Sequence, residues 1–390
     1  MQALSFTNCG LPKREVYDFS TYQKLSPSSQ QEALDLFDGD TFVYDIITGC
    51  DLKTFIILSP RLSERHSKYL QERIAEQGFT VSLLLPKIKS HIVVCRNPTS
   101  KQFIELGCRS FPLDEPNSLV SHLACKRPSK ISYTLQKDEH LDHINDWVAF
   151  QLREYLADLV ILFDNNSNAC YDFGALSSSL LSLGDSVFLK HVPFKYGPAG
   201  TTTDGQLLKA YKDLLLQASM FEYVKSCIML AGLQEALLLN TDIDELIFCR
   251  GDTTPFTLLP GDKLGLLFSG YWCYPPVSFS EEGIATYEDH VFINPVNRIS
   301  GDRKWLLRVN EATFPCWQSA HLISRLPDNG NPESVIGEPD ATAFFLHHYA
   351  VTNRWRGTRS VSDKQEGVLV SAREFDVINK MISTYVPSLT

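Results

Sequence analysis

The chain lacks the features that would mark a membrane-spanning, zinc-binding or nucleic-acid-binding protein. No apolar run approaches the roughly 20 residues of a spanning helix, and the N-terminus does not read as a secretory signal. None of the ten cysteines forms a C-x-x-C pair, which argues against a zinc ribbon or a redox motif. Lys and Arg number 36 against 46 Asp and Glu, and the formal net charge of −10 opposes binding to a phosphate backbone. We therefore expect a cytoplasmic protein with reduced thiols, no nucleic-acid partner, and at most peripheral contact with the inner face of a membrane.

The composition is that of a large globular protein. The chain has 390 residues, of which 44% are hydrophobic and 21% charged. Domains typically have about 100–200 residues, so this length allows two of them. A polar stretch at 125–130 predicts a domain boundary. We expect an α/β accessory region over 1–127, a main domain over 128–360 and a helical tail over 361–390.

The accessory region shows no phosphate-binding glycine loop and no other catalytic signature. Residues 1–50 read as irregular, and after them the pattern predicts a small β-α-β-β unit followed by a helix near Ser100–Leu106. The predicted strands of this unit are Thr54–Leu58, Thr80–Leu85 and His91–Cys95, and its helix is Ser63–Gln77.

The main domain alternates apolar strands with helices, which is typical of an α/β fold with a parallel sheet. The expected strands are Ile131–Leu135, Leu159–Phe163, Ser186–His191 and Ala236–Asn240, with helices over 141–156 and 207–230. The glycine-rich loop Tyr196–Gly205 is expected to be a mobile lid. From Lys263 onward the pattern becomes β-rich, with strands expected at Leu264–Tyr274, Lys304–Val309 and Ala343–Val351, before a last helix at Glu374–Tyr385.

The sharpest chemical signal is an acidic cluster, Asp242-Ile243-Asp244-Glu245, that directly follows an apolar strand. Carboxylates two residues apart at a strand end can bind one divalent cation, and hard oxygen ligands suit Mg²⁺ or Mn²⁺. A solvated turn is the alternative interpretation. The position at the carboxyl end of a buried strand, where α/β sheets bind their ligands, favours a ligand site.

An ordered set of motifs surrounds this cluster. It consists of K-D-E at 137–139, F-D-N-N-S at 163–167, Gln217, N-T-D-I-D-E-L at 240–246 and H-H-Y at 347–349. Over Ile131 to Arg359 this set resembles bacterial glycosyltransferases related to families 2 and 92. The resemblance implies a GT-A fold, with a Rossmann-like, mostly parallel central sheet flanked by helices. Asp138 and Leu246 depart from the family pattern, which usually has asparagine and an aromatic residue there.

The resemblance also implies roles for individual residues. Donor-binding roles fall on Lys137, Glu139, Asp164, Asn166, Gln217 and Asp242. The metal ligands would be Asp242, Asp244 and His348, holding Mn²⁺ or Mg²⁺, with His321 and His347 as competing histidines. From the residues alone, Asp164 and Asn166 could instead complete a turn, and Lys137 could be a solvated charge. Lys304 and Arg308 could meet phosphates, although solvated charge is the default for both.

These expectations combine into a metal-dependent, inverting glycosyltransferase that moves a sugar from a nucleoside-diphosphate donor to a glycan, lipid-linked or other hydroxyl acceptor. A carboxylate would deprotonate the acceptor. Glu245 is the candidate base, and Asp302, Glu311 and Asp340 are alternatives. Two other functions stay open. One is a non-catalytic nucleotide-sugar or glycan-binding protein on a transferase scaffold, and the other is a D-x-D phosphohydrolase.

Overall fold

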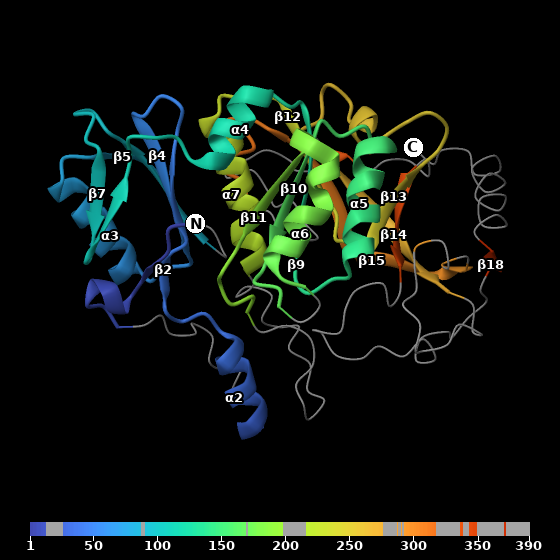
Figure 1. The fold of residues 1–390 in the computed structure, drawn as a ribbon, viewed down its shortest axis with the longest axis horizontal. Helices are drawn as coiled ribbons and strands as arrows, with labels where there is room; N and C mark the ends of the chain where they lie inside the picture. Colours follow the sequence, from blue (N-terminus) through green and yellow to red (C-terminus); the bar gives the residue numbers. More distant parts are fainter. Residues whose placement is uncertain are drawn as a thin grey trace. The chain divides into compact units, whose positions relative to one another are not determined.

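The computed structural model describes residues 1–12, 26–86, 90–168, 171–197, 216–275, 287, 290, 292–316, 336–337, 343–348 and 370–371. These residues form a mixed α/β protein with two compact units, each assembled from separate stretches of chain (Figure 1). Unit 1 comprises Met1–Ser129, His191–Ala236 and Val309–Ser319, and unit 2 comprises Lys130–Lys190, Leu237–Arg308 and Ala320–Thr390. Several expectations lie outside the described residues: the expected helices at 207–215 and Glu374–Tyr385, the loop residues 198–205, and His321 and Asp340.

In the part of unit 1 that the structure describes, the centre is a four-stranded antiparallel sheet in the order β3-β4-β6-β5. Its strands are β3 (Asp45–Thr48), β4 (Thr54–Pro60), β5 (Thr80–Pro86) and β6 (Ser90–Arg96). Two further strand pairs are β1 (Leu4–Ser5) with β2 (Thr41–Val43) and β7 (Phe103–Leu106) with β8 (Arg109–Pro112). Its helices are η1 (Thr7–Cys9), α2 (Pro27–Leu36), α3 (Glu64–Glu76), α4 (Ser118–Lys126) and α7 (Leu216–Leu230).

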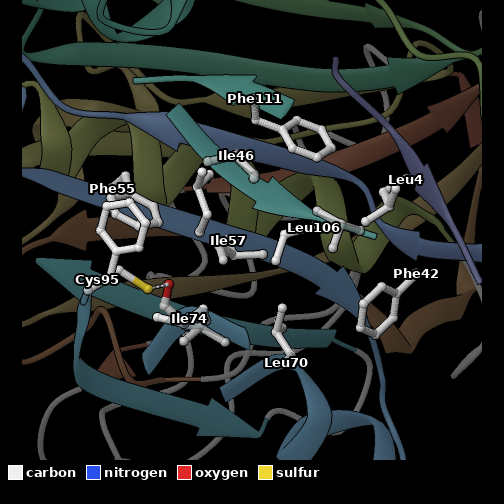
Figure 2. Close-up of a cluster of buried hydrophobic side chains, with 14 of the residues drawn as sticks. Leu4, Phe42, Ile46, Phe55, Ile57, Leu70, Ile74, Cys95, Leu106 and Phe111 are labelled. Atoms are coloured by element: carbon white, nitrogen blue, oxygen red, sulfur yellow. Dashed lines mark hydrogen bonds between the residues drawn. The ribbon is translucent and has the colours of Figure 1, made fainter. Parts of the chain in front are cut away.

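Strands β3, β4 and β6 of the unit 1 sheet are buried on both faces, whereas the edge strand β5 is partly exposed. Alternate residues of a strand point to opposite faces. Phe55 and Ile57 of β4 pack with Leu70 and Ile74 of α3 in one apolar core (Figure 2). The intervening residue Ile56 is also buried, and β4 and β6 pack against α7 as well. This two-sided burial explains why β4 reads as a continuous apolar run.

Two expectations for the N-terminal 127 residues are wrong. The segment expected as a helix near Ser100–Leu106 contains strand β7, in which Phe103 and Glu105 are exposed while Ile104 and Leu106 are buried. That alternation has a period of two, which a strand satisfies and a helix does not. Residues 1–50 are also not irregular, because they contain β1, η1, α2, β2 and β3.

The described residues of unit 2 form a ten-stranded mixed sheet, whose main path is β11-β10-β9-β12-β15-β14-β17-β13. The strands expected in the main domain are confirmed as β9 (Lys130–Gln136), β10 (Leu159–Asp164), β11 (Val187–His191), β12 (Ala236–Asn240), β14 (Gly265–Tyr274), β15 (Phe292–Val309) and β17 (Ala343–His348). Strand β13 (Glu245–Cys249) lies at one edge, and the short strands β16 (Ile336–Gly337) and β18 (Val370–Ser371) pair with β14 and β15. The helices are α5 (Leu141–Arg153), α6 (Phe173–Leu180), η2 (Leu181–Ser186) and η4 (Pro255–Leu258).

The sheet of unit 2 changes character along its width. Strands β10 and β12 both run parallel to β9, so the carboxyl ends of these three strands share one edge. Strands β14 and β15 pair antiparallel, as do β13 and β17, whereas β14 and β17 are parallel. The sheet as a whole is therefore mixed. One portion is parallel, and the neighbouring portion contains both antiparallel and parallel strand pairs.

Apolar clusters hold the elements of unit 2 together. Helix α5 buries Ile144, Trp147 and Val148 with residues of β10 and α6. A second cluster joins Leu239 of β12 and Phe345 of β17 with residues of β13, β14 and β15. Across the described residues, no helix is both long enough and apolar enough to cross a bilayer.

Candidate active site

The acidic cluster lies in the tight turn that joins β12 to β13. The backbone N–H of Glu245 donates to the carbonyl of Asp242 at 3.0 Å, and the N–H of Asp242 donates to Glu245 Oε2 at 3.1 Å. These reciprocal bonds close the turn. Asp244 and Glu245 are buried, with 3% and 2% exposure, while Asp242 is more accessible. We call Asp242, Asp244 and Glu245 the carboxylate turn.

Two tyrosines, the buried Tyr155 and the partly buried Tyr287, hold this turn in place. Tyr155 follows α5, and its hydroxyl donates to the carbonyl of Ile247 at 2.9 Å and accepts from the N–H of the same residue. The hydroxyl of Tyr287 donates to the carbonyl of Ile243. Because both tyrosines bind backbone atoms beside the carboxylates, they fix the position of the turn and leave the side chains of its acids for other partners.

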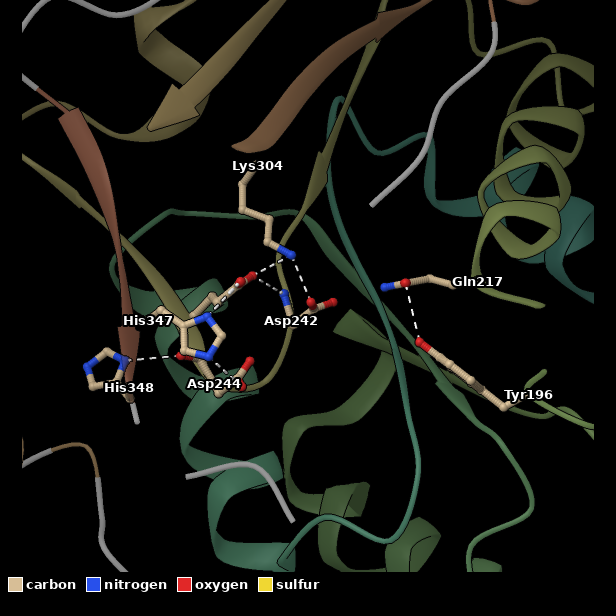
Figure 3. A network of polar contacts seen from close by, with 8 residues as sticks. Tyr196, Gln217, Asp242, Asp244, Lys304, His347 and His348 are labelled. Carbon is tan, nitrogen blue, oxygen red and sulfur yellow. Dashed lines mark hydrogen bonds and ion pairs between the residues drawn. The ribbon is translucent and has the colours of Figure 1, made fainter. Parts of the chain in front are cut away.

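Lys304 of β15 supplies the first cation of the site. Its side chain is 0% exposed, and its Nζ lies 2.7 Å from Asp242 Oδ2 and 2.5 Å from Glu245 Oε2 (Figure 3). Burial lowers the pKa of Lys304, but the charges of Asp242 and Glu245 more than reverse this effect and raise it above its ordinary value. Lys304 is therefore a charged lysine in the apolar interior of the sheet, not a solvated one.

His347 of β17 lies against the other side of the carboxylate turn. Strands β13 and β17 place Glu245 opposite His347, so the imidazole reaches two acids. Its Nε2 lies 3.1 Å from Asp244 Oδ2 and its Nδ1 lies 3.2 Å from Glu245 Oε1. Burial lowers the pKa of His347, but Asp244 and Glu245 raise it to about 9. The carboxylates thus favour a positive charge at this position.

Asp244, Glu245 and His347 have the arrangement of a cation site. One ligand atom from each lies within 4.8 Å of the other two. The Nε2 of His347 is buried, and its approach to Asp244 lacks hydrogen-bond geometry. Two carboxylate oxygens and an imidazole nitrogen suit Mn²⁺ and also Mg²⁺, although the latter prefers oxygen. The donor set therefore fits the expected metal, and binding would require His347 to lose its proton.

His348, the histidine that the resemblance selects as a metal ligand, contacts the backbone of the turn. The backbone N–H of His348 donates to the carbonyl of Asp244 at 2.7 Å, and the ring Nδ1 lies 3.3 Å from the same oxygen. Its ring packs edge-on against Tyr287 and His290. Burial, followed by the nearby His290, lowers the pKa of His348 to about 3, so this imidazole is neutral. The structure thus groups His347, rather than His348, with the carboxylate side chains, and the choice of ligand stays a prediction.

The residues expected to begin the donor pocket follow β9 and β10. Gln136 Nε2 donates to Asp164 Oδ1 at 2.5 Å, and the hydroxyl of Tyr171 donates to the same oxygen at 3.2 Å. Asp164 Oδ2 accepts from the N–H of Ser167 at 3.2 Å. Both oxygens of the fully buried Asp164 thus have protein partners, which favours the turn-forming interpretation of this residue.

The other expected donor residues are placed differently. Glu139 is buried and Lys137 half-buried, while Asn166 is exposed with a positive φ of 58°, a conformation that asparagine tolerates well. Gln217 belongs to unit 1, where it is buried on α7 and accepts a hydrogen bond from the hydroxyl of Tyr196 at 3.4 Å.

Two residues of this site have a more central place than the sequence predicts. Lys304 was expected to be solvated by default, yet it stands directly before Trp305, Leu306 and Leu307, all fully buried. A lone lysine that enters such a run is a signal of a buried ion pair. His347 was a competing alternative, and only the pairing of β13 with β17 brings it to the carboxylates.

Comparisons with known proteins do not assign the chain to a family. No family model and no curated protein matches the chain. A solved structure described as "Crystal Structure of a Mycobacterial Protein" matches 71% of this chain and 82% of its own, with 11% sequence identity and a TM-score of 0.29. A similarity this low carries no argument about fold or function.

Proposed function

We propose that the protein is a metal-dependent glycosyltransferase of the GT-A type, which moves a sugar from a nucleoside-diphosphate donor to a hydroxyl acceptor with inversion. The observation that carries the proposal is the carboxylate turn after β12, with His347 directed at Asp244 and Glu245. Support also comes from the parallel strands β10, β9 and β12, whose carboxyl ends share one edge. Open α/β sheets bind ligands at such an edge.

In this proposal Asp244, Glu245 and His347 hold a divalent cation. A bound Mn²⁺ or Mg²⁺ would act as a Lewis acid that stabilises the negative charge of the diphosphate. Asp242 has 18% exposure and is the most accessible acid of the turn, which suits contact with the donor's ribose or sugar. Lys137 and Asn166, which follow β9 and β10, are accessible enough to contact the donor as well.

The contacts of Glu245 favour a positioning role over the role of general base. Its Oε2 contacts Lys304 and accepts from the N–H of Asp242, and its Oε1 lies beside His347. A base needs an oxygen within hydrogen-bond reach of the acceptor hydroxyl. Glu311 is exposed in unit 1, while the side chains of Asp302 and Asp340 lie outside what the structure describes. The base therefore has no assigned residue in this proposal.

The first test is Asp244→Asn. Loss of one anionic ligand should weaken Mn²⁺-dependent binding of a nucleoside diphosphate by about tenfold or more, since even partners of metal ligands contribute about 10–100-fold. Binding to the native state raises its stability by RT ln(1 + [L]/Kd), so a thermal shift with and without Mn²⁺ reports it. Asp262→Asn, at an exposed turn of unit 2, is the matched control and should behave like the wild type. Equal Mn²⁺-dependent shifts in Asp244→Asn and the wild type would contradict the ligand role.

Turnover separates this proposal from the two alternatives. A panel of nucleotide sugars should give transfer to an acceptor sugar, with release of the nucleoside diphosphate. Donor binding without turnover for every donor and acceptor would favour a binding protein. Release of inorganic phosphate from phosphate esters, with no sugar transfer, would favour the phosphohydrolase.

A further inference from the structure

Lys304 is a buried charge that the proposed transfer reaction does not use. Its side chain is 0% exposed on β15, and the next three residues of the strand are fully buried and apolar. Burying an ammonium group is costly unless it is paired. Its partners therefore indicate why a lysine stands here.

The contacts divide the carboxylate turn into two halves. Lys304 Nζ contacts Asp242 Oδ2 at 2.7 Å and Glu245 Oε2 at 2.5 Å. His347 contacts Asp244 Oδ2 at 3.1 Å and the other oxygen of Glu245, Oε1, at 3.2 Å. Figure 3 shows the ammonium group and the imidazole approaching the turn separately. Glu245 belongs to both halves, with one oxygen facing each cation.

We infer that Lys304 is a built-in cation that closes the Asp242 half of the carboxylate turn and confines a single divalent ion to the half formed by Asp244 and His347. The inference rests on the proposed function, which supplies the ion. Three carboxylates so close together would otherwise attract an ion at either half, or two ions. The ammonium group occupies one half permanently and also fixes the orientation of Glu245, so Lys304 is a positioning residue.

The variant Lys304→Met tests this inference. Lys304→Met keeps the length and apolar character of the side chain but removes its charge. A positive charge beside a cation site opposes cation binding. Lys304→Met should therefore bind Mn²⁺ more tightly, with a Kd lower by about tenfold or more, or should bind a second ion. A loss of folding alone cannot increase affinity, so this readout distinguishes positioning from a merely structural role.

The experiment measures free Mn²⁺ by electron paramagnetic resonance during titration of the metal-stripped full chain, with folding checked by circular dichroism. Lys304→Arg, which keeps the charge, should bind like the wild type. Lys190→Met, which removes a half-exposed lysine of β11, should do so too. If Lys304→Met does not fold, Asp242→Asn should weaken Mn²⁺ binding, and the charge-balanced pair Asp242→Asn with Lys304→Met should restore it.

The outcomes separate the inference from the proposed function. Wild-type binding with unchanged or weaker binding in folded Lys304→Met would overturn the inference and leave metal dependence standing. Binding only in Lys304→Met would overturn both, because the natural protein would then hold no ion for Lys304 to confine. No binding in either protein would overturn both.

Discussion

At the scale of the residue, His91 shows how one buried imidazole couples folding to pH. His91 is 6% exposed on β6, and its Nδ1 accepts a hydrogen bond from the N–H of Leu62 at 3.0 Å. Only an unprotonated Nδ1 can accept this bond. Burial, followed by the charge of Arg61, lowers the pKa of His91 to about 4. The folded protein therefore holds His91 neutral where the unfolded chain would protonate it.

The sign of the pH effect follows from this difference. Between the ordinary histidine pKa near 6.5 and the folded value of about 4, the unfolded chain binds more protons, so stability falls as the pH falls. The full effect of the shift is about 3 kcal/mol. His91→Asn, whose amide oxygen can accept the same bond, should remove this part of the pH dependence. Urea unfolding at pH 7 and pH 4.5 measures the free energy of unfolding of both proteins. If His91→Asn loses as much stability between these pH values as the wild type, the role of His91 is contradicted.

At the scale of the element, the position of His347 depends on how closely β14 and β17 approach. Gly270 of β14 pairs with Phe345 of β17, and the Phe345 ring occupies the space that a β-carbon on Gly270 would need. A methyl group there would lie 2.5 Å from ring carbons of Phe345. The absence of a side chain at Gly270 thus lets β17 pair with β14 and present His347 to the turn.

Gly270→Ala should therefore destabilise the protein by about 1–3 kcal/mol, the usual cost of overpacking. It should also weaken Mn²⁺ binding, because β17 must shift. The control is Gly261→Ala, where an added β-carbon meets no atom within 4 Å. Urea unfolding and Mn²⁺ titration measure the two effects. Identical midpoints for Gly270→Ala and Gly261→Ala would show that the sheet accommodates the methyl group without cost.

Helix α7 depends on a buried ion pair of its own. Lys225 Nζ lies 3.0 Å from Glu222 Oε2 and donates to the carbonyls of Phe314 and Cys316, at 3.3 and 2.8 Å. Both side chains of the pair are at most 1% exposed. The ammonium group therefore ties the helix to the segment that follows β15, within unit 1.

Lys225→Met should lower the free energy of unfolding by about 3–5 kcal/mol, because it removes the cation that pairs with the buried charge of Glu222. The double variant Glu222→Gln with Lys225→Met should recover part of this loss. Lys68→Met is the control, since Lys68 and Glu72 form an exposed pair on α3 at 3.9 Å, and exposed pairs contribute about 0–1 kcal/mol. Urea midpoints compare the variants, and similar losses for Lys225→Met and Lys68→Met would contradict the prediction.

At the scale of the whole molecule, unit 1 is not an N-terminal domain in the sense of one continuous stretch. It takes helix α7 from His191–Ala236 and a short segment from Val309–Ser319. Helix α7 packs against β3, β4, β6 and α4. Helix α7 covers one apolar face of the unit 1 sheet. In the sequence, this helix comes only after Lys130–Lys190, which belong to unit 2.

A fragment of residues 1–129 should consequently fail to unfold cooperatively, because removal of α7 exposes one face of its sheet to water. Circular dichroism during urea titration would show a broad, shallow change in place of a sharp transition. The full chain is the reference. A cooperative transition in the fragment, with the midpoint of the full chain, would show that residues 1–129 form an independent domain.

Much of the fold was readable in the sequence, because β10 and β12 appear as continuous apolar runs and the apolar residues of α5 recur at a helical spacing. Strands β9, β10, β11 and β12 and helix α5 were all expected where they lie. Strand β7 was not, although its alternation of exposed and buried residues has a strand period. Short segments such as 100–106 carry too few residues for one periodicity to exclude the other.

By itself, the sequence determined that an acidic cluster follows a buried strand, because that requires only local order along the chain. It could not decide the partners of those acids. Lys304 stands 59 residues after Glu245, and His347 stands 102 residues after it, so both contacts arise only from the pairing of distant strands. The side on which a strand residue points reverses with a shift of one position. The register of β13 with β17, which belongs to the tertiary structure alone, is what brings His347 to the carboxylates and His348 to the backbone of the turn.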